Sequence, residues 1–324
     1  RTVEEVKQDI DAIAHISGLL TGNISETEDG DPDADLRNIA PGYIQHVLFW
    51  LQYGMKSLFL QDADSLVIKS GQLVEILNHI RQKIPTVERI TSYSRAKTVG
   101  KKSPEELKAI REAGLNRVHI GMESGSTRVL EMIKKGVTPE EQVSAGQKAA
   151  AAGFELSEYF MPGIGGESLS KEHAVESAKV LNRINPTFIR LRTTRVLDNT
   201  PLQQMMCDEE WTPLSEVKIV EEIKCFIENL EGITGTIVSD HIMNLIEDAA
   251  GKMPRDKGTI LEILDKFLEM KVEDQESFII GRRLGHFRFL SDYSPNPRVE
   301  DIKAKLNLRY SSIEEAVRHI ARNY

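Results

Sequence analysis

The chain has 324 residues, 40% of them hydrophobic, which is enough for one large domain or for a domain with an appendage. Its 41 Lys and Arg against 50 Asp and Glu give a net charge of −9, so it has no general electrostatic attraction for nucleic acid. Its apolar runs are too short for a membrane span, and it begins as an amphipathic helix rather than a signal peptide. Two cysteines, Cys207 and Cys225, are too few for a disulfide framework or a four-cysteine metal site and indicate reduced thiols in a cytoplasmic protein.

The first predicted elements are helices. Val3–Ile16 has the spacing of an amphipathic helix, and Gly42–Tyr53 is predicted as a second one. Residues 21–40, between them, are acidic and rich in turn formers, which is typical of a surface insertion.

Helices and strands then alternate along the chain. Two helices open with the same signal, Ser103-Pro-Glu-Glu and Thr138-Pro-Glu-Glu, a capping box with proline at the first helical position. Both end at a glycine that a strand follows, and this rhythm is typical of β/α units around a parallel sheet. The five predicted strands are Ser57–Asp62, Val87–Tyr93, Leu115–Met122, Phe154–Phe160 and Thr187–Leu197. The other two predicted helices are Gly71–Ile84 and Lys171–Ile184.

After Pro201 the rhythm changes, and we place a domain boundary near residues 205–212. The remaining predicted helices are Leu214–Leu230, Lys257–Met270, Gln275–Arg283 and Ser312–Arg322, with a possible strand at Thr236–Ser239. We expect residues 1–210 to form the α/β domain and residues 211–324 a mostly helical region that covers it.

Ligands of parallel α/β folds bind at the carboxyl ends of the strands, which directs attention to the residues there. Two of these ends are glycine-rich and carry a glutamate: Gly121-Met-Glu-Ser-Gly and Met161-Pro-Gly-Ile-Gly-Gly-Glu. One such turn is ordinary, but two at consecutive strand ends favour a binding site. The chain has no Ser–His–Asp order, zinc-protease helix motif or phosphate-binding loop.

Several polar residues near these ends have two interpretations. Asp62 and Asp64 can bind a divalent metal or an ammonium group, and Asp64 can instead cap a helix. His119 is predicted to pack in the core. His241 and Asn244 share one face of a predicted helix and either reach a pocket or serve capping and packing.

Five stretches together resemble the radical S-adenosylmethionine (SAM) superfamily, and most closely its branch with oxygen-independent coproporphyrinogen oxidase. The likeness extends over about residues 1–205, and the stretches are LFLQDADSL, ITSYSRAKTV, AGLNRVHIGMESGSTRVLEMIKKGVT, FELSEYFMPGIGGE and FIRLRTTRVLDNTPL. The resemblance implies a partial (β/α)6 barrel of the TIM type, with its first strand upstream of residue 1.

The resemblance also implies which residues bind SAM. The segment that takes the SAM amino group falls on Gln61-Asp62-Ala63, where an Asp62 carboxylate replaces the family's glycine backbone. The ribose contact of the next strand falls on Tyr93, with Ser94 and Arg95 beside it.

The remaining implied SAM contacts follow the later strands. Glu123 stands at the position, acidic or amide in the family, that follows the fourth strand of the family's barrel, which is the third predicted strand of this chain. Lys135 stands at the basic position that pairs with the SAM carboxylate. Gly163 begins the glycine-rich segment near the adenine, Val196 is the last adenine contact, and Arg192 points into the barrel. SAM carries an ammonium group and a carboxylate, which a protein carboxylate and a protein cation can bind.

The CxxxCxxC motif that holds the family's 4Fe–4S cluster is absent from this sequence. We expect it upstream of Arg1, within about 30 residues, the reach of one strand and its loop. The alternative is a barrel that has lost the cluster.

The predicted function is therefore that of a radical SAM enzyme with SAM and a 4Fe–4S cluster as cofactors. The resemblance implies reductive cleavage of SAM and hydrogen abstraction from a small-molecule substrate, with an electron donor of the flavodoxin or ferredoxin type as partner. The alternatives are a SAM-binding barrel without redox activity and a metal-dependent lyase or hydrolase that uses Asp62, Asp64 and Glu123.

Overall fold

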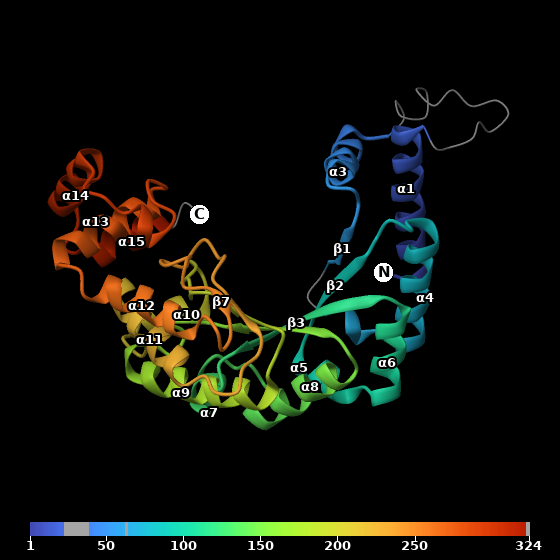
Figure 1. The fold of residues 1–324 in the computed structure, drawn as a ribbon, viewed down its shortest axis with the longest axis horizontal. Coiled ribbons are helices and arrows are strands. Elements are labelled where there is room, and N and C mark those ends of the chain that lie inside the picture. Colours follow the sequence, from blue (N-terminus) through green and yellow to red (C-terminus); the bar gives the residue numbers. More distant parts are fainter. Residues whose placement is uncertain (23–38, 62–63, 322–324) are drawn as a thin grey trace. The chain divides into compact units, whose positions relative to one another are not determined.

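The structure is a computed structural model that describes residues 1–22, 39–61 and 64–321 (Figure 1). These residues form two compact units, which are described separately: Arg1–His119 with Lys148–Glu155, and Ile120–Gln147 with Leu156–Tyr324. Most of the predicted insertion at residues 21–40 lies outside the described residues.

Seven strands follow one another in a single sheet in chain order, and the sheet is mostly parallel. The pairs β1–β2, β4–β5 and β5–β6 are parallel, and β6–β7 is antiparallel. The strands are β1 (Ser57–Leu60), β2 (Arg89–Ser94), β3 (Leu115–Glu123), β4 (Glu155–Phe160), β5 (Phe188–Leu191), β6 (Thr236–Val238) and β7 (Gly251–Lys252). This architecture confirms the predicted α/β fold of the partial-barrel type.

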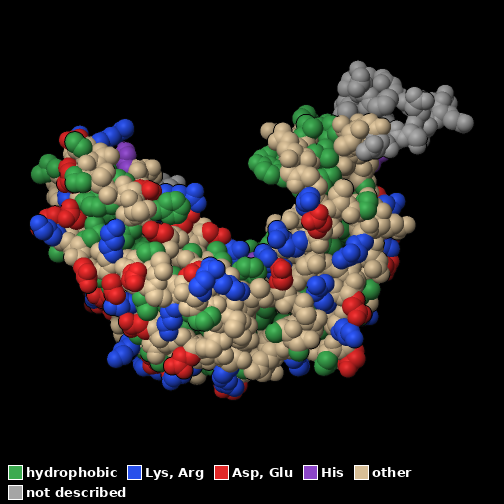
Figure 2. All heavy atoms as spheres, viewed as in Figure 1, with side chains coloured by type: hydrophobic (Ala, Val, Ile, Leu, Met, Phe, Trp, Pro, Cys, Tyr) green, Lys and Arg blue, Asp and Glu red, His purple; other side chains and the backbone are tan. Residues whose placement is uncertain are grey.

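The first unit contains β1, β2 and the start of β3 together with helices, of which α4 buries Leu73, Leu77 and Ile80. Its elements are α1 (Val3–Thr21), α3 (Pro41–Gln52), η1 (Ser65–Val67), α4 (Ser70–Lys83), α5 (Ala96–Lys101) and α6 (Pro104–Ala113). Figure 2 shows hydrophobic side chains gathered over α3, where Tyr43 and Phe49 are exposed.

The second unit has its core where α9 and α11 meet β4: the Phe226 ring of α11 stacks on Phe160 of β4 at 4.0 Å. The helices that belong wholly to this unit are α7 (Thr127–Met132), α9 (Gly166–Ile184), α10 (Pro201–Cys207), α11 (Glu216–Glu228), α12 (Lys257–Leu268), α13 (Val272–Arg283), η2 (Leu290–Asp292), α14 (Pro297–Arg309) and α15 (Ile313–Ala321). Helix α8 (Pro139–Ala151) contributes to both units. Among the described residues, no helix has the length and apolar character needed to cross a membrane.

The predicted helix signals are confirmed. At α6 the Ser103 hydroxyl accepts a hydrogen bond from the backbone of Glu106, whose carboxylate accepts one from Ser103 in return. Thr138 and Glu141 make the same exchange at α8. Gly114 follows α6 with φ of 125°, a backbone angle that suits glycine.

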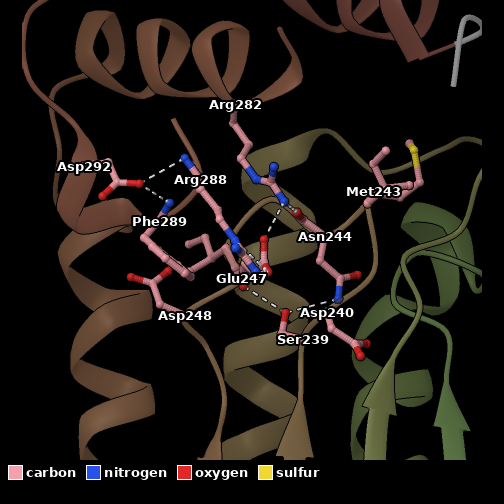
Figure 3. Close-up of polar contacts among 12 residues, drawn as sticks. Ser239, Asp240, Met243, Asn244, Glu247, Asp248, Arg282, Arg288, Phe289 and Asp292 are labelled. Carbon is pink, nitrogen blue, oxygen red and sulfur yellow. Dashed lines mark hydrogen bonds and ion pairs between the residues drawn. The ribbon is translucent and has the colours of Figure 1, made fainter. Parts of the chain in front are cut away.

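Two predictions near the end of β5 are wrong. The predicted strand Thr187–Leu197 ends at Leu191, because the backbone and hydroxyl of Thr193 donate to the Asn244 side chain instead of continuing the sheet. His241 and Asn244 lie in a turn rather than on one helical face. Asn244 is buried, and its amide donates to the Leu191 carbonyl and to Ser239, so its side chain fastens strand ends together (Figure 3).

Candidate functional site

The predicted acid and base at the end of β3 are in contact. Lys135 Nζ lies 2.9 Å from Glu123 Oε1, and the two side chains are 29% and 19% exposed. Glu123 has φ of 62°, and Lys134 with φ of 52° turns the chain back after α7. A Cβ on Gly121 would lie 2.3 Å from Glu123 Oε1, so a larger residue there would displace the Glu123 carboxylate from its present position. The result is a half-buried ion pair at a strand end.

A buried carboxyl group lies near this pair. Glu158 of β4 is 2% exposed. Burial, and next the charge of Glu123, raise the pKa of Glu158 well above its ordinary value. No sequence pattern indicates Glu158 as a site residue, because a polar residue in a strand usually faces solvent.

The glycine-rich loop after β4 is held from the C-terminal part of the chain. Gly163, with φ of 86°, donates its backbone N–H to Glu222 Oε1 of α11 at 2.6 Å. Trp211 Nε1 donates to the carbonyl of Ile164 at 3.1 Å. The shape of the loop therefore depends on residues beyond position 210.

His173 of α9 ties this loop to the loop after β3. Its Nε2 lies 3.0 Å from the Met161 carbonyl and its Nδ1 2.8 Å from the Ser124 hydroxyl. Burial lowers the pKa of His173 to about 4, so the ring is neutral. A proton on Nε2 satisfies both contacts, since Nε2–H then donates to the carbonyl and Nδ1 accepts from the hydroxyl. Ser177, one turn later, accepts from the backbone of Gly125 at 2.8 Å.

A cleft of about 120 Å³ lies beside Gly163 and Val196, two of the predicted adenine contacts. Apolar side chains from Trp211, Ile219 and Met243 line it. At its edge Arg283 of α13 makes a two-pronged ion pair with Glu216, and Arg283 is 2% exposed. The cleft therefore combines an apolar wall with charged and hydroxyl side chains.

Arg192 is the remaining predicted residue of the second unit. It follows β5 and pairs with Asp240 at 2.9 Å, and its guanidinium lies 5.1 Å over the Tyr159 ring.

The predicted residues of the first unit have structural contacts of their own. Tyr93 packs against Phe59 and His119, with ring centroids 4.8 and 5.7 Å apart, and His119 is buried as expected. The Asp64 carboxylate accepts hydrogen bonds from Ser94 at 2.9 Å and from Thr98 at 2.5 Å.

These contacts decide one alternative for Asp64, and two other predicted residues are exposed. Asp64 makes no side-chain cap at η1, so the capping interpretation is wrong. Gln61 is exposed, and Arg95 is exposed at the start of α5. Asp62 and Ala63 lie outside the described residues.

Comparison with known proteins identifies the domain. Residues 46–178 match the family model of the Radical SAM superfamily. This part of the chain is therefore similar to a radical SAM domain. Enzymes of this superfamily use SAM and a 4Fe–4S cluster, as the resemblance implied.

Two curated relatives have different activities in their names. An uncharacterized methyltransferase of Pyrococcus horikoshii is 27% identical over 180 residues, 54% of this chain and 38% of its own length. A tRNA uridine(34) acetyltransferase of Methanocaldococcus infernus is 25% identical over 122 residues, 37% of this chain and 23% of its own. The chain therefore spans less than two-fifths of either relative.

A solved structure shares the fold. The archaeal Elp3 of Methanocaldococcus infernus, with an N-terminal deletion, superposes with a TM-score of 0.50 at 15% identity. The match covers 73% of this chain and 61% of that one.

The residues present fit one of the two cofactors. A zwitterion with a ribose and an adenine suits a half-buried acid and base, a glycine loop and an apolar cleft. The cluster has no ligand set here: Cys207 is exposed, Cys225 is on α11, and the described residues hold no group of three side chains suited to a metal.

Proposed function

We propose that the protein is a radical SAM enzyme in which Glu123 and Lys135 bind SAM. A bound 4Fe–4S cluster would supply the one-electron chemistry for reductive cleavage of SAM and hydrogen abstraction from a small-molecule substrate. The observation that carries the proposal is the half-buried Glu123–Lys135 pair at the end of β3, within residues matched by the family model. A donor of the flavodoxin or ferredoxin type would deliver the electron.

In this proposal the chain's own residues bind and orient SAM. Glu123 accepts from the ribose hydroxyls or the ammonium group, and Lys135 binds the carboxylate. Glu123 and Lys135 separate when SAM binds, so each side chain exchanges its partner in the ion pair for a group of SAM. Gly163 and Val196 contact the adenine at the apolar cleft, and Glu222 fixes the loop that carries Gly163.

The other contacts implied by the resemblance extend the proposal. Gln61-Asp62-Ala63, Tyr93, Ser94 and Arg95 are proposed to contribute to the same cofactor, whereas Arg192, which the resemblance also implied, pairs with Asp240 and is assigned to the substrate below. For Ser94 this requires the hydroxyl to remain oriented by Asp64.

Removing either charge should weaken SAM binding. We expect Glu123→Gln and Lys135→Met each to raise the dissociation constant about tenfold to a hundredfold, because a charge-assisted hydrogen bond contributes about 1.5–3 kcal/mol. Isothermal titration calorimetry measures this. Exposed neighbours provide matched controls, Glu131→Gln and Lys134→Met, which should leave the affinity unchanged. Equal affinity in all four variants would show that SAM does not bind at this pair.

The reaction type has its own test. Protein purified without oxygen and given SAM with a strong reductant should contain iron and form 5′-deoxyadenosine and methionine, the products of reductive cleavage. S-Adenosylhomocysteine would instead indicate methyl transfer, the activity in the name of the Pyrococcus relative. SAM binding without iron or products would favour a barrel without redox activity.

A further inference from the structure

Two arginines of the second unit share one carboxylate. Arg190 Nη1 lies 2.7 Å from Asp240 Oδ2, and Arg192 Nη1 lies 2.9 Å from Asp240 Oδ1. Arg190 is in β5 and Arg192 directly follows it, whereas Asp240 comes two residues after β6. Figure 3 shows the Asp240 carboxylate directed away from the neighbouring cluster of Glu247 and Arg282.

The alternation of β5 places both arginines on one face of the sheet. Leu191 is in register with Phe160, whose ring stacks on His173 of α9 and Phe226 of α11. Leu191 therefore faces the helices, and its neighbours Arg190 and Arg192 face the other side. That side is not closed over them: their side chains are 17% and 25% exposed, and that of Asp240 is 49% exposed.

The charges of this cluster do not balance. Two guanidinium groups face one carboxylate, and the neighbouring His241 adds no charge. Burial and the charge of Arg192 lower the pKa of His241, so its ring is neutral near pH 7. One positive charge is left over.

Donors are also left over. Each guanidinium has five N–H bonds, and among the described residues each of these two gives a single hydrogen bond, to Asp240. Arg190 Nε is a buried donor without a hydrogen-bond partner in the described part of the chain, and His241 Nδ1, which donates or accepts according to the tautomer, is buried without one as well. Buried donors normally have partners, so this cluster is suited to accept another group.

We propose that Arg190 and Arg192 form an anion-binding site that takes a carboxylate or phosphate group of the substrate. Planar guanidinium forks match the paired oxygens of both groups. Tyr159 supports the site, because Arg192 lies over its ring and Arg190 is its partner in the sheet register. That the anion belongs to the substrate rests on the proposed function, whereas the anion site itself does not.

Nitrogen-15 labelling of the arginine side chains gives a direct test. We expect inorganic phosphate or acetate to shift the Nε–H signals of Arg190 and Arg192, and the group with the lower dissociation constant identifies the preferred substrate class. Arg183, which pairs with Glu140 on the surface of the same unit, is the internal control and should not respond. Chloride at equal ionic strength should shift none of the three.

Two variants distinguish an anion-binding site from a cluster that only connects β5 to β6. Arg192→Gln should weaken phosphate binding by about tenfold or more through the lost charge-assisted hydrogen bonds. Asp240→Asn should tighten it by about tenfold, because it removes the competing negative charge. If Asp240→Asn instead weakens binding as Arg192→Gln does, or if chloride reproduces the shifts, the three residues only connect β5 to β6.

Saturating SAM distinguishes the source of the anion. Phosphate binding that persists in the presence of SAM supports a substrate site, while displacement of phosphate by SAM overturns it and assigns the arginines to the cofactor. Failure of SAM to bind at Glu123 and Lys135 would count against the proposed function and leave the phosphate titration interpretable.

Discussion

Glu222 and His173 are two buried titratable groups with opposite effects on stability. Burial raises the pKa of Glu222 to about 7, although hydrogen bonds from Ser170 and Gly163 oppose it. The folded protein therefore holds a proton that the unfolded chain loses, so this group makes stability fall as pH rises from about 4.5 to 7. Burial lowers the pKa of His173 to about 4, and this group makes stability rise as pH rises from about 4 to 6.5.

Replacing Glu222 with glutamine should expose the His173 effect. Because the falling contribution is gone, the free energy of unfolding of Glu222→Gln should rise with pH between 4.5 and 6.5 more steeply than that of the wild type. Because the pKa of Glu222 is about 7 in the folded protein and about 4.5 in the unfolded chain, the relative gain at pH 7.5 is up to about 3 kcal/mol. Urea unfolding from pH 4.5 to 8 measures both proteins, and a difference that stays constant with pH would contradict the pKa of Glu222.

Sequence could identify Glu123 and Lys135 but not Glu222 and His173. The resemblance to the radical SAM superfamily singled out the first two as candidates, and they stand at a strand end and at the end of the short helix after it. Glu222 and His173 lie within long helices, and helical spacing does not tell which polar residue tertiary packing will bury. A polar residue on the apolar stripe of α9, next to Leu169 and Ala174, was the signal available.

At the scale of the elements, the loop after β3 comes very close to helix α9 at Gly125. A Cβ on Gly125 would lie 2.4 Å from the Glu176 carbonyl and 2.7 Å from the Ser177 Cα, which are backbone atoms that cannot turn aside. The contact also carries the hydrogen bond from the Gly125 backbone to Ser177.

Gly125→Ala should therefore force the loop and α9 apart. We expect a loss of about 1–3 kcal/mol in the free energy of unfolding, the usual range for overpacking, together with weaker SAM binding if the proposed function holds. Gly258→Ala in α12 is the matched control, since nothing lies within 4 Å of its added methyl group and alanine favours a helix by about 0.5–1 kcal/mol. Urea unfolding compares them, and equal stability of Gly125→Ala and the wild type would mean that the loop yields easily.

At the element scale the capping signals and the β/α rhythm were enough to predict the parallel strands and the long helices. The end of β5 was not predictable, because Asn244, about 50 residues later, takes the hydrogen bonds of Thr193. Helix α14 was missed, although Pro297 stands at its start and Asn296 caps it, since its apolar spacing is weak.

At the scale of the whole molecule, the C-terminal region is joined to the α/β part by buried contacts within the second unit. Trp211 donates to Ile164, Glu222 accepts from Gly163, and Phe226 stacks on Phe160. Each contact joins a residue beyond position 210 to β4 or the loop after it. These contacts support the prediction that residues 211–324 pack on the barrel and do not form a separate module.

Limited proteolysis tests this prediction through the segment at residues 205–212, which includes the exposed Cys207. After a cut there, we expect the two fragments to stay together on size-exclusion chromatography under native conditions and to separate only in denaturant. The reason is that each fragment alone would expose Phe160 or Phe226 to water, and burying a phenylalanine side chain contributes about 1.5–3 kcal/mol. Phe226→Ala is the matched variant, which should loosen the association of the cut fragments. If instead the wild-type fragment 213–324 elutes alone and folded, the region is an independent domain, and the loop with Gly163 must hold its shape without Glu222.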